Sequence, residues 1–430
     1  MKTFEYPRQK KALERAFEAA QPSDAKTERL VSRIISDVQK RGDTALLEYT
    51  RKFDKIKLAK RDLRVPAEVC HAAWEQLDEQ LARALRYAAD GIRAFHEKQL
   101  RTGYVMKRRG AVLEQRIRPL KRVGVYVPGG RATYPSTMLM NVIPAQVAGV
   151  KEIYAVTPPV HGKPEDFVPF AVAHLLGLGG NVFQVGGAQA VAALAFGTDT
   201  IPKVDKVAGP GNVFVATAKK LLYGTIDIDS VAGESEVLII ADDTSRADYI
   251  AADLLAQAEH TGGETVVLVG IGRDFDFTAV QKALRDQLRA APRRKQAEAS
   301  LAKGGFFVRV DTREQAVEVA EMKAPEHLEI LTTNPEEIAD EISNVGAIFL
   351  GPFTPEPVGD YVAGPNHVLP TSGTARFFSP LGVDAFLKSS NVLKFDGESF
   401  LEAAPHVITL AESEQLFAHA NAVRIRLGSR

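Results

Sequence analysis

Short apolar runs that alternate with helical patterns constrain the fold of this chain more than any other feature. The first series of runs, with the helical patterns between them, covers 123–127, 153–157, 165–176, 181–185, 188–196, 206–208 and 213–222. A second series of strand-like runs, again separated by helices, covers 237–241, 265–269, 305–310, 327–331 and 347–350. Strands that alternate with helices are typical of parallel sheets, because a parallel pair needs a long crossover. The sequence therefore predicts two α/β units.

Composition limits the class of protein. A chain of 430 residues is too long for one compact core. Lysine and arginine balance aspartate and glutamate at 54 each, so nucleic acid is not an expected partner. No apolar run is long enough to span a bilayer, and the first residues have no signal-peptide pattern. Cys70 is the single cysteine, which excludes an internal disulfide and a thiolate-built metal site. These features predict a cytoplasmic protein without a membrane partner.

Three of the predicted strands in the first series end in glycines. The turns are Gly129–Gly130, Gly186–Gly187, and Gly209 with Gly211. Glycine at the carboxyl end of a strand lets the backbone approach a ligand, and the following helix directs its free N–H groups there. A single turn of this kind is better explained as ordinary connecting structure. Three of them favour a nucleotide-binding half, although the usual G-x-G-x-x-G fingerprint is absent.

The later half of the chain carries pairs of nitrogen and oxygen donors at close spacing. The pairs are Gln257 with His260, Glu326 with His327, Asp360 with His367, and Glu414 with His419. Each pair taken singly is better explained as ordinary hydrogen-bonding residues. Together they suggest a site without thiolates, which suits Zn²⁺, Mn²⁺ or Co²⁺. A glutamate beside a histidine is also a plausible acid/base pair. A nucleotide half joined to a metal half indicates a metal-assisted dehydrogenase.

The residues resemble the histidinol dehydrogenase family over nearly the whole chain, from about Arg41 to His419. The motifs that carry the resemblance lie at 126–130, 185–190, 209–212, 257–260, 325–328, 359–361 and 366–371. The resemblance implies an α/β fold of two Rossmann-like three-layer α/β domains with helical N- and C-terminal arms. It also implies oxidation of L-histidinol through L-histidinaldehyde to L-histidine, the last two steps of histidine biosynthesis, with two NAD⁺ reduced.

The resemblance further implies a role for particular residues. One zinc per subunit is expected on Gln257, His260, Asp360 and His419. His327 is expected to remove the alcohol proton, and Glu326 to activate water for the second oxidation. Positions that match substrate contacts are Ser235, Gln257, His260, His327, Asp360, His367, Glu414 and His419. Positions that match NAD contacts are Tyr126, Gln189 and Asn212.

The expected organisation follows from the same resemblance. Residues 1–25 form an N-terminal helical arm, and residues 123–236 form the NAD-binding domain. Residues 26–122 and 237–378 form the domain that carries the metal and catalytic residues. Residues 379–430 form a helical tail that completes the site of the partner subunit in an intertwined homodimer.

Small departures from the family pattern leave the substrate less fixed than the reaction. Glu234 stands where proline is usual before Ser235, and Ala324 stands where glycine is common. The first alternative is a related zinc/NAD alcohol dehydrogenase for another small polyol, such as a sulfonated propanediol, but Glu414 favours histidinol. A nucleotide- and metal-binding protein without turnover is disfavoured by Glu326 and His327. A metallohydrolase would leave the glycine-rich half without a task.

Overall fold

The computed structural model describes residues 1–18, 25–129 and 134–428, and the chain divides into two compact units. The main unit comprises Met1–Gln99 and Leu120–Phe386, and the tail unit comprises Leu100–Pro119 and Leu387–Arg430. Each unit is described by itself below. Gly130 of the first glycine turn and residues 19–24 of the predicted N-terminal arm lie outside the described residues.

The first sheet of the main unit has six parallel strands in the order β1-β12-β11-β10-β13-β14. Their bounds are Lys2–Glu5 (β1), Glu236–Ala241 (β10), Thr265–Ile271 (β11), Gly305–Val310 (β12), His327–Leu331 (β13) and Ala347–Leu350 (β14). All five runs predicted for this part of the chain are therefore strands. β1 was not predicted. Residues 1–25 were expected to be helical, but the arm begins with this edge strand and becomes helical only at α1 (Lys10–Glu18).

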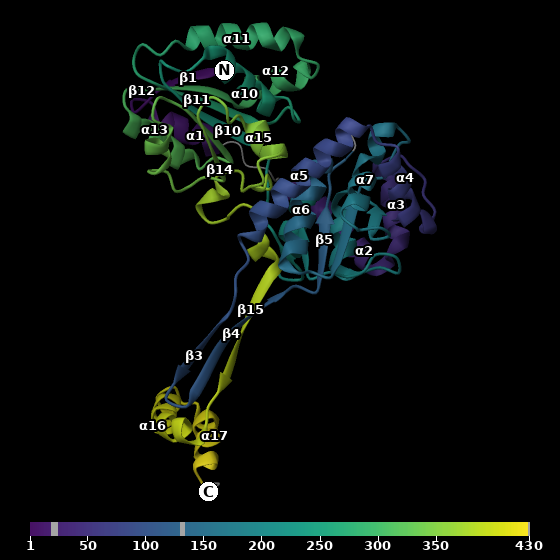
Figure 1. Cartoon of the computed structure of the whole chain (residues 1–430), viewed down its shortest axis with the longest axis vertical. Coiled ribbons are helices and arrows are strands. Elements are labelled where there is room, and N and C mark those ends of the chain that lie inside the picture. The colour runs from purple at the N-terminus through teal and green to yellow at the C-terminus, as the bar shows by residue number, and fades with distance from the viewer. Residues whose placement is uncertain (19–24, 130–133, 429–430) are drawn as a thin grey trace. The chain divides into compact units, whose positions relative to one another are not determined.

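Helices cover both faces of this sheet, which makes three layers (Figure 1). Leu13 of α1 packs on one face with α13 (Arg313–Lys323) and α14 (Pro335–Ala339). The other face packs against α10 (Ala247–Ala258), α11 (Phe277–Ala290) and α12 (Arg294–Gly304). Because both faces are buried, the strands are continuous apolar runs rather than alternating ones. A short helix, α15 (Glu356–Tyr361), follows β14.

The second sheet of the main unit has the order β2-β7-β6-β5-β8-β9, and it is parallel except where β2 joins β7. Its strands are Arg64–Val65 (β2), Arg122–Tyr126 (β5), Glu152–Thr157 (β6), Val182–Gln184 (β7), Lys206–Ala208 (β8) and Asp227–Ile228 (β9). The chain order reverses between β5 and β8. Ligands of open α/β sheets bind at such a point, outside the carboxyl ends of the strands.

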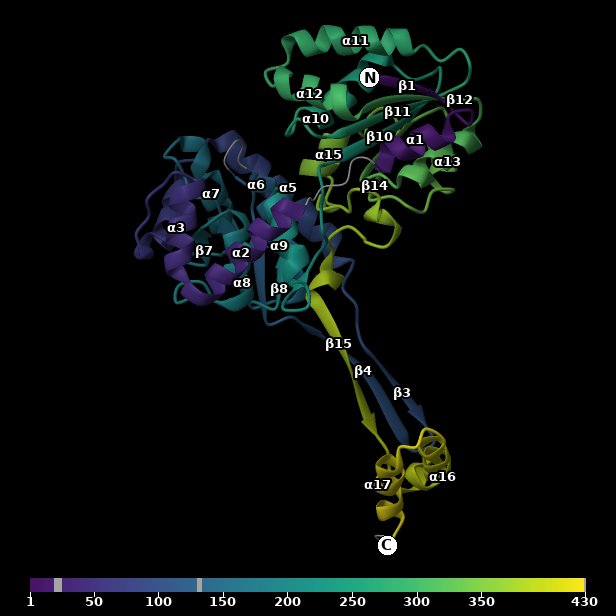
Figure 2. The ribbon, with the colours of Figure 1, turned by 180° about the vertical axis from the view of Figure 1, so that it is seen from behind.

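Helices again flank this sheet, as the view from behind shows (Figure 2). One apolar core contains residues of α2 (Ala25–Arg41), α3 (Asp43–Phe53), α8 (Gly187–Phe196) and α9 (Val213–Leu222). The remaining helices of this part, which pack on one another, are α4 (Ala67–Glu75), α5 (Glu79–Glu97), α6 (Pro135–Ala148) and α7 (Val168–Leu175). Short 3-10 turns cover Lys60–Asp62, Pro164–Phe167, Thr374–Arg376 and Val383–Phe386.

The grouping of the N-terminal region differs from the predicted one. Residues 26–122 were expected with the first domain, but α2 packs on α8 and α9, and β2 pairs with β7 of the second sheet. An amphipathic stripe predicts that one helix face is buried, and it carries no information about which sheet covers that face. Among the described residues, no helix is long and apolar enough to cross a bilayer.

The tail unit combines strands and helices. Its antiparallel sheet has the order β15-β4-β3, with bounds Leu387–Lys394 (β15), Ala111–Pro119 (β4) and Tyr104–Arg108 (β3). Two helices complete it, α16 (Gly397–Ser413) and α17 (Phe417–Leu427). Residues 379–430 were predicted to be helical throughout. β15 was missed because it is mostly exposed and polar, so its pairing with β4 leaves no apolar alternation in the sequence.

A buried ion pair anchors the glycine turn that follows β8. The Lys219 ammonium contacts the Asp229 carboxylate, and the two side chains are 2% and 3% exposed. Lys219 Nζ also donates to the Gly209 carbonyl oxygen at 3.0 Å, and Asp229 accepts from the Gly209 N–H at 2.8 Å. Both charges therefore satisfy the backbone of one glycine, whose φ of +112° favours a residue without Cβ.

We expect Lys219→Met to lower the free energy of unfolding by about 3–5 kcal/mol, because it leaves the Asp229 carboxylate buried without its cation. Urea denaturation of the full chain measures this loss. The matched control is Lys220→Met, which removes an exposed ion pair with Glu28 and should cost less than about 1 kcal/mol. Equal losses of unfolding free energy in the two variants would contradict a structural role for the buried Lys219–Asp229 pair.

Candidate active site

The first residue of β10 holds the predicted acid/base pair through its backbone. β10 and β13 run side by side, with Val237 opposite His327. The Glu236 N–H donates to the Glu326 carboxylate at 2.8 Å, and His327 Nδ1 donates to the Glu236 carbonyl oxygen at 3.1 Å. Glu326 and His327 are 4% and 3% exposed. The parallel pairing of two strands therefore fixes both side chains at one edge of the sheet.

The hydrogen bond at Nδ1 determines what His327 can do. A backbone carbonyl only accepts, so Nδ1 carries a proton and Nε2 of the neutral ring presents a lone pair. Nε2 is buried and has no hydrogen-bond partner among the described residues. It lies 3.8 Å from Asp360 Oδ1. An unpartnered buried nitrogen of this kind is available to a ligand.

Burial and neighbouring charge shift the ionisation of this pair. Burial raises the pKa of Glu326 to about 8, although the His327 charge opposes the shift. Burial alone would lower the pKa of His327, but the carboxylates of Glu356, Glu326 and Asp360 outweigh it and raise that pKa well above its usual value. Groups with displaced pKa values in one buried cluster are typical of active sites.

Donor groups that could hold a metal ion surround His327. Single ligand atoms of His327, Glu356 and Asp360 lie within 4.8 Å of one another. Burial alone would raise the pKa of Asp360, but the nearby His327 imidazole and the charges of His367 and His260 hold it below its usual value. The Gln257 amide is fully buried and, with its nitrogen toward Glu356, donates to that carboxylate at 2.8 Å. The predicted residues Gln257, His260 and Asp360 are thus in one neighbourhood.

His260 lies just beyond the end of α10. α10 ends at Ala258 with Glu259 as its cap, so Gln257 and His260 do not share a helical face. Instead, His260 Nδ1 donates to the Gln257 carbonyl oxygen at 3.0 Å, which leaves Nε2 free to accept or to bind a metal. The helix end, rather than its face, thus brings the His260 ring to the Gln257 backbone.

A buried glutamate folds the turn that follows His260. Glu264 is 0% exposed and accepts from the N–H groups of residues 261–263 at 2.7–3.0 Å. The hydroxyls of Thr261 and Ser300 each donate to it at 2.6 Å. Burial alone would raise the pKa of Glu264, but these hydrogen bonds lower it. Glu264 was not among the predicted residues, and its signal in the sequence is an acidic residue that directly follows two glycines.

The loop that follows Asp360 returns His367 to the same place. His367 Nδ1 donates to the Asp360 carbonyl oxygen at 3.0 Å, and Nε2 lies 3.4 Å from Thr137 Oγ1 of α6. Burial lowers the pKa of His367. Ser235 directly precedes Glu236, and its carbonyl oxygen accepts from the Thr265 N–H. Ser235 is therefore adjacent to the residue whose backbone holds the acid/base pair.

The residues predicted to contact NAD lie at the glycine turns of the second sheet. The Tyr126 hydroxyl accepts from the Gly187 N–H at 3.0 Å, and burial raises the pKa of Tyr126 to about 12. Asn212 caps α9 by accepting from Phe214 N and Val215 N. Gln189 is 1% exposed, and its Oε1 has no partner in the part of the chain that the structure describes. Tyr126 and Asn212 therefore have structural tasks, whereas Gln189 keeps a polar atom unused.

Two predicted residues belong to the tail unit. Glu414 follows α16 as its cap, and His419 lies on α17; both are exposed. Glu356 was missed, although it precedes Asp360 by one helical turn on α15 and is 2% exposed. A carboxylate at that spacing shares a helix face with Asp360, so the pattern was present in the sequence.

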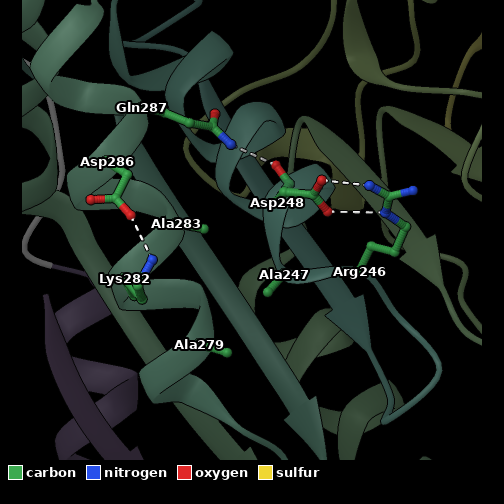
Figure 3. Close-up of a pocket in the computed structure, with 8 residues that line it drawn as sticks. All are labelled: Arg246, Ala247, Asp248, Ala279, Lys282, Ala283, Asp286 and Gln287. Carbon is green, nitrogen blue, oxygen red and sulfur yellow. Dashed lines mark hydrogen bonds and ion pairs between the residues drawn. The ribbon is translucent and has the colours of Figure 1, made fainter.

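A surface pocket between α10 and α11 is separate from these residues (Figure 3). Arg246 pairs with Asp248, Lys282 pairs with Asp286, and Gln287 Nε2 donates to the Asp248 carbonyl oxygen. These charges satisfy one another, so the pocket offers no group that calls for a ligand.

Comparison with known proteins identifies the relatives of the chain. A protein-family model described as histidinol dehydrogenase matches residues 18–427. Histidinol dehydrogenase of Caldanaerobacter subterraneus is 48% identical, over 92% of this chain and 91% of that protein. The Aquifex aeolicus enzyme of the same name is 46% identical, over 93% and 92%. A crystal structure of histidinol dehydrogenase from Elizabethkingia anophelis matches with a TM-score of 0.91 and 36% identity, over 100% of this chain and 98% of that one.

We expect Glu264→Gln to lower the free energy of unfolding at neutral pH by about 1–3 kcal/mol, because an amide cannot accept from every donor that faces the carboxylate. A depressed folded-state pKa stabilises above the ordinary value of 4.5 and loses its effect as the pH falls through the folded value. The difference from the wild type should therefore shrink in acid.

Urea denaturation at several pH values measures this difference. Glu298→Gln is the control, because Glu298 forms only an exposed ion pair with Arg294. A constant difference down to strongly acidic pH would show that the Glu264 charge is not the cause.

Proposed function

The chain belongs to the histidinol dehydrogenase family of NAD-dependent oxidoreductases, and from this premise we propose that it oxidises L-histidinol through L-histidinaldehyde to L-histidine on a zinc site. The observation that carries the proposal is the buried cluster in which Glu326 and His327 stand beside Asp360 and near Gln257 and His260. It joins an acid/base pair to metal-type donors at one sheet edge.

The donors of the main unit suit zinc. They are imidazole, carboxylate and amide groups, the cluster is buried, and His260 Nε2 has a free lone pair because Nδ1 is engaged. Gln257, His260 and Asp360 would hold the ion, with His419 of a second copy as the fourth ligand. When bound, zinc supplies a Lewis acid that anchors and orients the substrate.

His327 is suited to take protons in both oxidations. Its Nδ1–H is held by a backbone carbonyl, so protons are accepted and released at Nε2 alone. Glu326 is held by a backbone N–H beside it, in a site dry enough to raise its pKa to about 8. In its ionised form Glu326 can take a proton from the water that the second oxidation consumes. His367, Ser235 and Glu414 would contact the substrate.

The glycine turns of the second sheet would receive NAD⁺, which accepts the hydride. They lie at the carboxyl ends of β5, β7 and β8, around the reversal of strand order where dinucleotides bind in open sheets. The unpartnered Oε1 of Gln189 gives this edge a buried acceptor for a ligand donor. Tyr126 and Asn212 would contribute by shaping the turns.

We propose that the metal site is completed in a homodimer. The tail unit carries exposed apolar side chains, and Leu393, Leu410, Phe417 and Ile425 are each 60–67% exposed. Surfaces of this kind mark an interaction site. We infer that a second copy covers them, which would bring Glu414 and His419 to the partner's main unit. A cytoplasmic location accords with a small-molecule biosynthetic enzyme.

We expect two NADH per L-histidinol consumed to completion with zinc present, and L-histidine as the product. Absorbance of NADH and chromatography of the product measure the ratio. One NADH with accumulation of an aldehyde would contradict the second oxidation. Reduction of NAD⁺ with a sulfonated propanediol, but not with histidinol, would support the alternative substrate class. The names of the relatives do not favour that class.

We expect His327→Asn to keep its zinc and to lose at least about a hundredfold in turnover, as is typical for removal of a general base. His419→Ala should lose zinc. If the tail completes the partner's site, a mixture of the two variants should recover about a quarter of wild-type activity, because half of the dimers are mixed and one of their two sites is intact.

The control mixture is His327→Asn with Glu326→Gln. Both substitutions lie in the main unit, so every site of a mixed dimer keeps a defect and no activity returns. Absence of recovery in the first mixture would show that each site is built within one subunit.

A further inference from the structure

The loop between Asp360 and His367 lies directly against the backbone of α5. Gly364 has a φ of +107°, and a Cβ there would fall 2.7 Å from the Gly91 carbonyl oxygen. A Cβ on Gly91 would in turn fall 3.0 Å from the Val362 carbonyl oxygen. Helix and loop therefore touch through two glycines, with no side chain between them.

The Asn366 side chain joins the same loop to two helices. Its Nδ2 donates to the Met140 carbonyl oxygen of α6 at 2.6 Å and lies 3.5 Å from His96 Nε2 of α5. Its Oδ1 accepts from the Val368 N–H at 2.9 Å. Asn366 is 5% exposed, so these bonds are made in a dry environment where each one is costly to lose.

His96 is suited to accept from Asn366. It is fully buried, and its Nδ1 donates to the Ile92 carbonyl oxygen at 2.8 Å. Burial lowers the pKa of His96, against backbone hydrogen bonds with Ile92 and Leu381 that raise it, and this favours the neutral ring. With the proton on Nδ1, Nε2 can accept the second hydrogen of the Asn366 amide.

We propose that Gly91, His96 and Asn366 form a clamp that positions Asp360 and His367 from outside the active site. The clamped segment runs between these two residues, and the bond from His367 Nδ1 to the Asp360 carbonyl oxygen closes it into a ring. A shift of Val362 by a few tenths of an ångström is thereby transmitted to Asp360, two residues earlier. None of the three clamp residues is among the predicted metal ligands or substrate contacts, so we assign them as positioning residues.

The proposal deepens the proposed function, because it assumes that Asp360 binds the metal and that His367 contacts the substrate. It also predicts an unusual effect of alanine at Gly91, inside α5. Glycine to alanine inside a helix normally stabilises it, whereas here the added methyl group meets the loop backbone.

The test is Gly91→Ala in the full-length enzyme, with Asp90→Ala as the matched control. Asp90 is exposed and precedes Gly91 on α5, so its replacement raises helix propensity without touching the loop. We expect Gly91→Ala to lower kcat about 10- to 100-fold, the range for a small misplacement of a reacting group. The KM for NAD⁺ should stay within about twofold, because the glycine turns are untouched.

A second readout is independent of turnover. In the cobalt-substituted enzyme, the visible absorption of Co²⁺ reports the geometry of its ligands, so Gly91→Ala should shift the band while Asp90→Ala should not. Asn366→Asp has the same shape as asparagine but loses both donated hydrogens, and it should give the same shift if Gly91→Ala fails to fold. Wild-type kcat and a wild-type cobalt spectrum in both Gly91→Ala and Asn366→Asp would overturn the clamp, as would a lowered melting temperature with no change in either.

The two proposals fail separately. If the wild type and Asp90→Ala do not oxidise histidinol, the proposed function fails. The clamp is then decided by the cobalt spectra, in which an unchanged band in both Gly91→Ala and Asn366→Asp overturns it and a shifted band supports it.

Discussion

The active site depends on the parallel pairing of β10 with β13, and above all on Glu236 where that pairing begins. The N–H and carbonyl of Glu236 hold Glu326 and His327, and its side chain forms a buried ion pair with Lys323 at the end of α13. A strand register, a helix end and two reactive side chains are thus tied to one residue. Because a shift in register would move both side chains off the shared edge, the proposed acid/base pair depends on the pairing of the two strands.

The second sheet uses the same device at its glycine turns. Lys219 and Asp229 are buried together and satisfy both backbone groups of Gly209. A buried ion pair contributes little net stability, since desolvation offsets its attraction. Here, however, it fixes the backbone of a loop at which we propose that NAD⁺ binds. At both sheets, a buried ion pair fixes the backbone geometry at the end of a strand.

The electrostatics of the site follow from crowding carboxylates in a dry place. Burial raises the pKa of Glu356 to about 7 and that of Asp253 to about 6, and the pKa of Glu329 rises well above its usual value. Of these acids, Glu356 acts on the imidazole of His327, whose pKa it raises together with Glu326 and Asp360. A cation and a proton acceptor are therefore favoured in the same few ångströms, which suits a reaction that needs both.

The sequence by itself determined the α/β class, the strands from β5 to β14 that its apolar runs mark, and the family, because these rest on local pattern and on motifs such as 325–328. It also named Gln257, His260 and Asp360, which the fold gathers. Tertiary structure alone decided which sheet α2 covers, that β1 and β15 are strands, and which backbone atoms of α5 and α6 the loop at Gly364 and Asn366 meets. These features depend on contacts between residues far apart in the chain, and such contacts leave no period in the local sequence.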